Sequence, residues 1–163
     1  MALKHLLLMR HAKSSWQHAS RDHERPLNER GHQAARAVGA SLRARNFMPS
    51  EIWSSDSQRT RETVAGLCAK SEAVCTEYLS GFYLAPANKV MYLCQERGEP
   101  NTHTLMLLGH NPGWEEVFCH FTNIPRRFPS GGCAVFTRQD PQADWLDAEA
   151  WRLVDFIQPR DLV

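Results

Sequence analysis

The chain has 163 residues and a formal net charge of +1, with 42% hydrophobic and 23% charged residues. This composition is typical of one soluble globular domain and excludes a disordered chain or a strongly basic nucleic-acid binder. No apolar run approaches the roughly 20 residues that cross a bilayer, so we expect neither membrane nor nucleic-acid partners.

The N-terminus and the cysteines indicate a cytoplasmic protein. The early run HLLLM is too short for a signal-peptide core and lacks a small-residue cleavage site, so we interpret it as a first strand. The five cysteines are widely spaced without a C-x-x-C pair, which favours reduced thiols.

Short apolar runs alternate with helical patterns along the chain. Strands are predicted at 4–9, 51–55, 72–79, 103–109, 133–138 and 151–157, and helices at 29–45, 57–70, 87–97 and 113–121. This alternation favours an α/β fold, a single three-layer domain over 1–163 whose mainly parallel central sheet has helices on both faces. The last two strands are expected to form a hairpin at an edge.

Polar residues follow the first strand directly. Arg10 and His11 come after LLLM and lead into Lys13, Ser14 and Ser15. In α/β sheets, ligands bind beyond the carboxyl ends of strands. A polar strand end without function has the same pattern, so these residues alone leave both interpretations open.

The second strand is followed by SSDSQRTRET at the start of a helix. Asp56 or Ser57 fits the N-cap, which places Arg59 in the first turn, where free N–H groups favour an anion. An arginine there opposes the helix dipole unless it serves such an anion. Arg61 is interpreted as an exposed residue without a role.

The fourth strand, TLMLLG, leads into His110 and a further helix. Asn111 is predicted as the N-cap and Pro112 as the first helical residue, so His110 marks the strand-to-helix switch. Two histidines and two arginines at separate strand ends fit a phosphoryl group. No metal is expected, because neither histidine has a cysteine or carboxylate at zinc-ligand spacing.

At these positions the sequence resembles the histidine phosphatase superfamily, which includes the cofactor-dependent phosphoglycerate mutases, and especially its small SixA-like phosphohistidine phosphatases. Four of its segments occur here in chain order: Arg10-His11-Ala12, ERPLNERGHQAAR at 24–36 leading into the first helix, Ser55 through Arg59 to Thr63, and Gly109-His110. The resemblance implies a phosphoglycerate mutase-like fold and no cofactor.

The resemblance also implies roles for the site residues. His11 would attack phosphorus and carry the phosphoryl group as a covalent phosphohistidine. Arg10 and Arg59 would hold phosphoryl oxygens through their N–H groups, and a protonated His110 would add a third donor.

Ser14 and Gln17 are weaker candidates for phosphate contacts. Ala12 stands where the family usually has glycine, and Gln17 where many members have asparagine, a variant that looks like the small bacterial type. The chain has no room for the inserted lid elements of the mutases, so mutase activity is the less expected outcome.

The acid that would protonate the leaving group is not identified by the sequence. Larger members place a glutamate after the third strand region, and Glu77 is the one carboxylate in the matching stretch CTEYLSGFYLAP. Glu77 is explained equally well as a solvent-facing strand residue, and Asp22 and Glu24 are alternatives. Without a positioned acid, phosphohistidine and activated aryl phosphates would be the preferred substrates.

We therefore predict a metal-independent phosphatase that acts on a phosphorylated protein, including protein phosphohistidine, or on a small phosphorylated substrate. Two alternatives remain: a small-molecule phosphomonoesterase or mutase of the same superfamily, and a phospho-ligand binding module without turnover. His11 separates the enzymes from the module, because binding alone requires no nucleophile.

Overall fold

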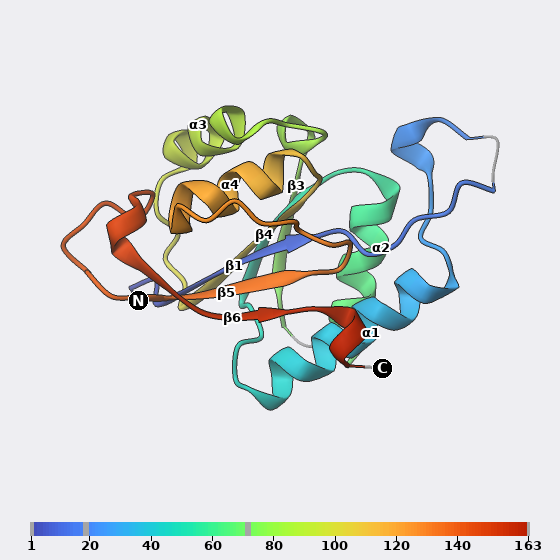
Figure 1. The fold of residues 1–163 in the computed structure, drawn as a ribbon, viewed down its shortest axis with the longest axis horizontal. Coiled ribbons are helices and arrows are strands. Elements are labelled where there is room, and N and C mark those ends of the chain that lie inside the picture. The colour runs from blue at the N-terminus through green and yellow to red at the C-terminus, as the bar shows by residue number, and fades with distance from the viewer. Residues whose placement is uncertain (1, 18–19, 71–72, 163) are drawn as a thin grey trace.

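A six-stranded sheet forms the middle layer of the computed structural model, which describes residues 2–17, 20–70 and 73–162. The strands are β1 (His5–Arg10), β2 (Glu51–Ser55), β3 (Cys75–Leu79), β4 (Thr104–Gly109), β5 (Cys133–Arg138) and β6 (Trp151–Ile157). The helices are α1 (Glu29–Ala44), α2 (Gln58–Leu67), α3 (Ala87–Arg97) and α4 (Gly113–Thr122). Figure 1 shows α3 and α4 on one face of the sheet and α1 and α2 on the other.

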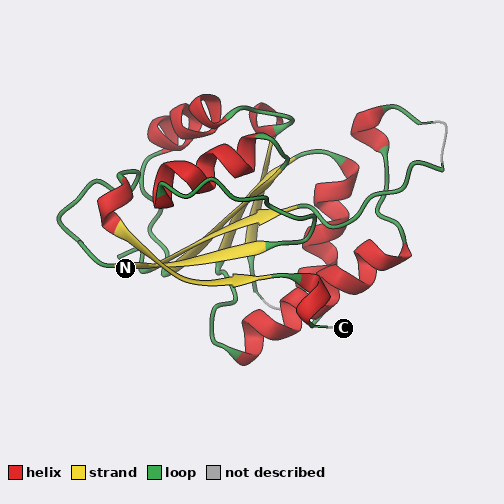
Figure 2. Cartoon of the chain, in the orientation of Figure 1, coloured by secondary structure: helices red, strands yellow, loops and turns green. Residues whose placement is uncertain are grey.

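The strands lie in the order β3-β2-β4-β1-β5-β6. The first four are parallel to one another, whereas β5 is antiparallel to both of its neighbours, β1 and β6. Figure 2 shows helices on both sides of the strands. The predicted three-layer α/β fold with a mainly parallel sheet is therefore confirmed, as is the hairpin at the edge.

Two predicted elements are shorter in the structure. The helix expected over 57–70 ends at Leu67, because residues 69 and 70 are exposed and continue no apolar face. The strand expected over 72–79 is observed from Cys75. Residue 72 of that prediction lies outside the described residues.

The prediction of Asn111 as the N-cap of α4 is wrong. The helix begins at Gly113 with Pro112 in the cap position. The Asn111 amide instead donates to Glu115 Oε2 at 2.8 Å and to the Phe128 carbonyl at 2.9 Å. Asn111 therefore ties the start of α4 to the loop that follows this helix.

The sheet divides the core into two layers. Because successive side chains of a strand point to opposite faces, Leu6 and Leu8 pack under α3 and α4, and Leu7 and Met9 pack against α1 and α2. All four are fully buried, which explains why β1 has a continuous apolar sequence. Among the described residues, no helix has both the length and the apolar character needed to cross a bilayer.

The carboxyl ends of β1 and β4 lie side by side, yet the chain leaves them toward opposite layers, to α1 and to α4. The pairing continues beyond β1, since the His11 N–H donates to the Gly109 carbonyl at 3.0 Å. A sheet whose neighbouring strands diverge in this way has its ligand crevice at that point. The fold therefore places His11 and His110 at the mouth of one crevice.

Gly31 lets α1 approach the loop that follows His11. The Asn28 side chain caps α1 by accepting from Gly31 N at 2.8 Å, and Asn28 N donates to the Lys13 carbonyl at 3.0 Å. A Cβ at Gly31 would lie 2.1 Å from that carbonyl oxygen, closer than any side chain can come. The segment 24–36 thus holds the loop beside the site.

Candidate active site

A cavity of about 430 Å³ opens at the carboxyl ends of β1, β2 and β4. We call it the phosphoryl pocket. Its lining residues are Arg10, His11, Lys13, Ser14, Trp16, Asp22, Arg25, Arg59, Leu84, His110, Asn111 and Ser130. The structure therefore brings together all four residues that the sequence predicts as catalytic, together with Ser14.

His11 is held as a neutral imidazole with a defined tautomer. Its Nδ1 lies 2.7 Å from the Ala12 carbonyl, which can only accept, so Nδ1 carries the proton and Nε2 is unprotonated. Arg59 Nε donates to that Nε2 at 3.3 Å. Burial lowers the pKa of His11 to about 3, helped by Arg59 and Arg10 and opposed by the bond to Ala12. His11 is thus unprotonated at the nitrogen that faces the pocket.

The motif from Ser55 to Thr63 contacts three parts of the site. Ser55 Oγ lies 2.8 Å from His110 Nε2, and Thr63 Oγ1 accepts from the Ala12 N–H at 3.0 Å. Arg59, midway between them, donates to His11. Arg59 and Thr63 are four residues apart on α2 and share one face of it, whereas Ser55 is the last residue of β2. The sequence indicated Arg59 but not the roles of its two partners.

His110 is 1% exposed and is neutral in this structure. Ser55 Oγ accepts from the Ser57 N–H at 3.4 Å and has a second lone pair, so it can either donate to or accept from His110 Nε2. When Ser55 donates, the ring proton of His110 is on Nδ1, which is buried and has no partner among the described residues. Burial, then the His11 and Arg59 charges, lower the pKa of His110 to about 2. The predicted protonated donor is corrected to a neutral ring with one N–H.

Arg10 reaches the pocket from the end of β1. Its Nη1 donates to the Phe128 carbonyl at 3.1 Å, and its Nε is buried without a partner among the described residues. Burial lowers the pKa of Arg10 despite the nearby Glu115, and Arg59 lowers it further. An arginine stays protonated, so Arg10 and Arg59 are both charged, and an anion between them would relieve their repulsion.

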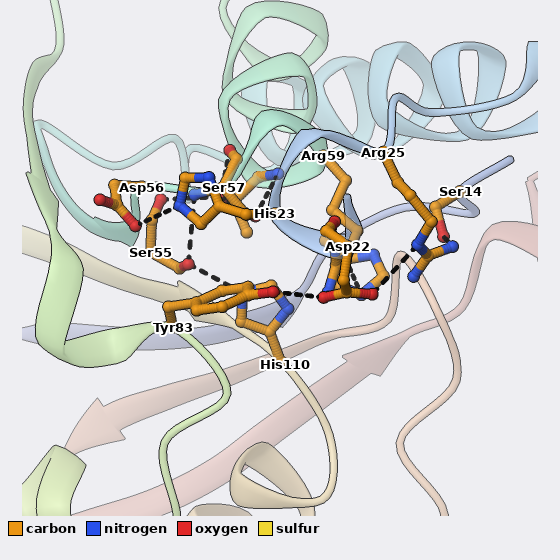
Figure 3. A network of polar contacts seen from close by, with 12 residues as sticks. Ser14, Asp22, His23, Arg25, Ser55, Asp56, Ser57, Arg59, Tyr83 and His110 are labelled. Atoms are coloured by element: carbon orange, nitrogen blue, oxygen red, sulfur yellow. Dashed lines mark hydrogen bonds and ion pairs between the residues drawn. The ribbon is translucent and has the colours of Figure 1, made fainter. Parts of the chain in front are cut away.

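Asp22 is the carboxylate that lines this pocket. It lies in a short 3₁₀ turn, η1 (Asp22–Glu24), and its Oδ2 accepts from Arg59 Nη2 at 3.0 Å and from the Tyr83 hydroxyl, as Figure 3 shows. Its Oδ1 accepts from Arg25 Nε at 3.1 Å. Burial acts to raise the pKa of Asp22, but the hydrogen bonds outweigh it and lower the pKa to about 2. Asp22 is therefore ionised at neutral pH.

The sequence could not separate Asp22 from Glu24, because the path of the loop decides which carboxylate faces Arg59. The next residue, His23, contacts Asp56 at 2.9 Å and packs edge-on against the Tyr83 ring at 4.7 Å (Figure 3). The contacts of the adjacent side chains of Asp22 and His23 thus hold this loop in place at the pocket. The signal in the sequence that points to this loop is its position between two recognisable motifs.

The remaining predicted residues are distributed as follows. Ser14 lines the pocket, and its hydroxyl accepts from Arg25 Nη1 at 2.8 Å. Gln17 is exposed and is not part of the lining. Glu77 lies on the edge strand β3, where it forms an ion pair with Arg97, and the structure does not bring it to the pocket.

The charges of the pocket favour an anion over a cation. The described residues contain no cluster of three or more histidine, cysteine or carboxylate side chains that could hold a metal ion. The free Nε2 of His11 faces Arg59, and Arg10 and Arg25 line the same cavity. These positive charges would repel a metal cation and attract a phosphate dianion.

We predict that the two buried histidines destabilise the protein in mild acid. The unfolded chain takes up protons near the ordinary histidine pKa of 6.5, whereas folded His11 and His110 do so only near about 3 and about 2. The free energy of unfolding should therefore fall as the pH drops from about 6.5 toward 3, by about 1.4 kcal/mol per pH unit for each histidine. Chemical denaturation of the wild type and a His11→Asn/His110→Asn variant across this range measures it. A variant with unchanged pH sensitivity would contradict the prediction.

Comparisons with known proteins agree with this geometry. The family model of the histidine phosphatase superfamily (branch 1) matches residues 6–81. An uncharacterized chloroplastic protein of Arabidopsis thaliana is 35% identical over 96% of this chain and 78% of its own length.

Two solved structures are similar over nearly the whole chain, both described as candidate phosphohistidine phosphatases SixA. The one from Agrobacterium tumefaciens is 27% identical, covers 98% of this chain and 100% of its own, and has a TM-score of 0.81. The one from Nakamurella multipartitia is 28% identical, covers 96% of each chain, and has a TM-score of 0.76.

Proposed function

Because this chain belongs to the histidine phosphatase superfamily, we propose that it is a phosphatase that works through a covalent phosphohistidine on His11 and uses no metal. The observation that carries the proposal is the unprotonated Nε2 of His11, which is buried beside Arg59 in a pocket rich in arginine. The SixA structures support protein phosphohistidine as the substrate class. We further propose that residues 1–163 form one histidine phosphatase domain.

The cytoplasmic location also remains a proposal. The described residues contain no disulfide, although all five cysteines of the chain are among them. Thiols that stay reduced are typical of a reducing compartment.

In the first step, His11 Nε2 attacks phosphorus as the bond to the leaving group breaks. The bond from Nδ1 to the Ala12 carbonyl stabilises the positive charge that develops on the ring. A guanidinium has five N–H bonds, and Arg59 uses three of them on His11 and Asp22. As Nε2 attacks, its lone pair forms the new bond to phosphorus and releases the Arg59 Nε–H. That N–H joins the two unused N–H groups of Arg59, Arg10 and a proton on His110 Nδ1 as donors for the phosphoryl oxygens.

In the second step, water attacks phosphorus and the bond to His11 Nε2 breaks, which releases inorganic phosphate and regenerates the neutral imidazole. The attacking water must lose a proton. That proton can pass to a phosphoryl oxygen, so that dihydrogen phosphate leaves, because the pKa of about 2 makes the Asp22 carboxylate a weak base.

We predict that His11→Ala abolishes phosphate release and that His110→Ala lowers it about 10²-fold, because the first removes the nucleophile and the second an oxyanion donor. The control is His103→Ala, which changes an exposed histidine outside the pocket and should retain activity. All variants are assayed on aryl phosphate and phosphohistidine substrates after exhaustive chelation. A His11→Ala variant near the wild-type rate would refute the covalent mechanism, and wild-type activity that is lost on chelation and restored by zinc or magnesium would refute metal independence.

The environment of Asp22 makes it a poor general acid. With a pKa of about 2 it holds almost no proton at neutral pH, and Arg59, Arg25 and Tyr83 all stabilise its charged form. Glu77 lies outside the pocket in an ion pair. A leaving group would therefore depart with little help from a carboxylic acid. Phosphoramidates avoid this limit, since their nitrogen can be protonated before the bond breaks.

We predict that kcat/KM falls steeply across aryl phosphates as the pKa of the leaving phenol rises, because no acid neutralises the departing oxygen. The same slope is expected for Asp22→Asn and for the control Glu77→Gln, which lies outside the pocket. Initial rates with a graded phenol series measure the slope. A flat wild-type series that becomes steep in Asp22→Asn would identify Asp22 as the acid, and the same change in Glu77→Gln would identify Glu77.

A further inference from the structure

A second cavity of about 920 Å³ adjoins the phosphoryl pocket and shares Arg10 and Asn111 with it. We call it the basic groove. Its far side is lined by Arg126 and Arg127, from the loop after α4, and by Arg160, from the segment after β6. The groove is the larger of the two cavities and is continuous with the proposed reaction centre.

The basic groove concentrates positive charge in a chain whose net charge is only +1. Four arginines line it against a single carboxylate, Glu115. That carboxylate is already engaged, because its Oε2 accepts from Asn111 Nδ2 at 2.8 Å and from Phe128 N at 3.4 Å. The field of the groove is therefore set by the arginines and favours acidic groups.

Several N–H groups in the basic groove are available to a ligand. Among the described residues, the Arg127 side chain has no hydrogen bond or ion pair, and Arg10 Nε is buried without a partner. Within the part of the chain that the structure describes, the only ion pair of Arg160 is with Asp161, at 3.9 Å and exposed, so it holds the guanidinium weakly. Arg126 is fixed instead, since its guanidinium lies 3.8 Å above the Phe156 ring.

Exposed apolar side chains border the same two cavities. Trp16 is 78% exposed and stacks on the Arg25 guanidinium at 3.5 Å, and Leu84 also lines the phosphoryl pocket. Ile124 lines the basic groove. These are three of the six large apolar residues that are exposed in the described part of the chain. Aromatic residues beside arginines are typical of surfaces that bind another protein, whereas a small metabolite needs no such border.

We propose that the basic groove binds an acidic segment of a phosphorylated protein, with Arg127 and Arg160 pairing with its carboxylates while its phosphoryl group lies at His11. The inference rests on the proposed function and specifies its substrate: a phosphoprotein with acidic residues next to the phosphorylated one. A nucleic acid is the competing occupant of a groove of this charge, and the experiment separates the two.

The test measures binding in a His11→Ala background, where the proposed nucleophile is absent and turnover is not needed. Two short phosphohistidine peptides of equal length are compared by fluorescence anisotropy, one flanked by aspartate and glutamate and the other by asparagine and glutamine. The acidic peptide should bind more tightly. Adding Arg127→Gln and Arg160→Gln should raise its Kd about three- to tenfold, toward that of the neutral peptide, as expected for two partly exposed ion pairs.

The matched control is Arg36→Gln, which removes an exposed arginine that lines neither cavity and should leave both values of Kd unchanged. Equal binding of the two peptides, or no effect of the groove substitutions, would overturn the inference. Tighter binding of a short single-stranded DNA, lost with the same substitutions, would assign the groove to a nucleic acid. If the wild-type protein releases phosphate from neither peptide, the proposed function is wrong, whichever way the binding results fall.

Discussion

The hydrogen bond from His11 Nδ1 to the Ala12 carbonyl determines which nitrogen of the proposed nucleophile faces the pocket. The peptide group between His11 and Ala12, which precedes this carbonyl, is held at both ends. Thr63 accepts from the Ala12 N–H, and Gly131 N donates to the His11 carbonyl at 2.9 Å. With this backbone held, the His11 ring has one favoured tautomer, and its free Nε2 meets the Arg59 guanidinium. The positions of α2 and of the loop before β5 therefore matter to the proposed chemistry, because both hold the peptide group that precedes the Ala12 carbonyl.

Arg59 links the two ends of the proposed reaction. One edge of its guanidinium contacts His11, and the other holds Asp22, the carboxylate that lines the pocket. Burial makes His11 and His110 neutral, whereas hydrogen bonds keep Asp22 ionised although burial opposes this. Neutral imidazoles beside charged arginines leave an excess of positive charge that a phosphate dianion can balance. An approaching dianion should in turn raise the pKa of both histidines, which strengthens His110 as a donor.

Much of the fold and part of the site could be predicted from the sequence for one physical reason. Residues that directly follow buried strands, such as His11 and His110, must lie at the carboxyl edge of the sheet, and Arg59 is fixed by the first turn of its helix. Asp22 could not be assigned, because its partner Tyr83 lies 61 residues away and only the folded loop brings them together. The cap at Asn111 was mispredicted for a similar reason, since its amide bonds to Phe128 beyond α4.

The central claim is that His11 carries the phosphoryl group on Nε2, and the most direct measurement is the position of phosphate on the protein itself. Wild-type protein would be mixed with an activated aryl phosphate, quenched rapidly in base and examined by phosphorus NMR and by mass spectrometry of its peptides. The Nδ1 proton donated to Ala12 predicts a phosphohistidine at His11 that is substituted on Nε2. Phosphate on Nδ1 of His11, on His110, or on no residue during active turnover would contradict the account.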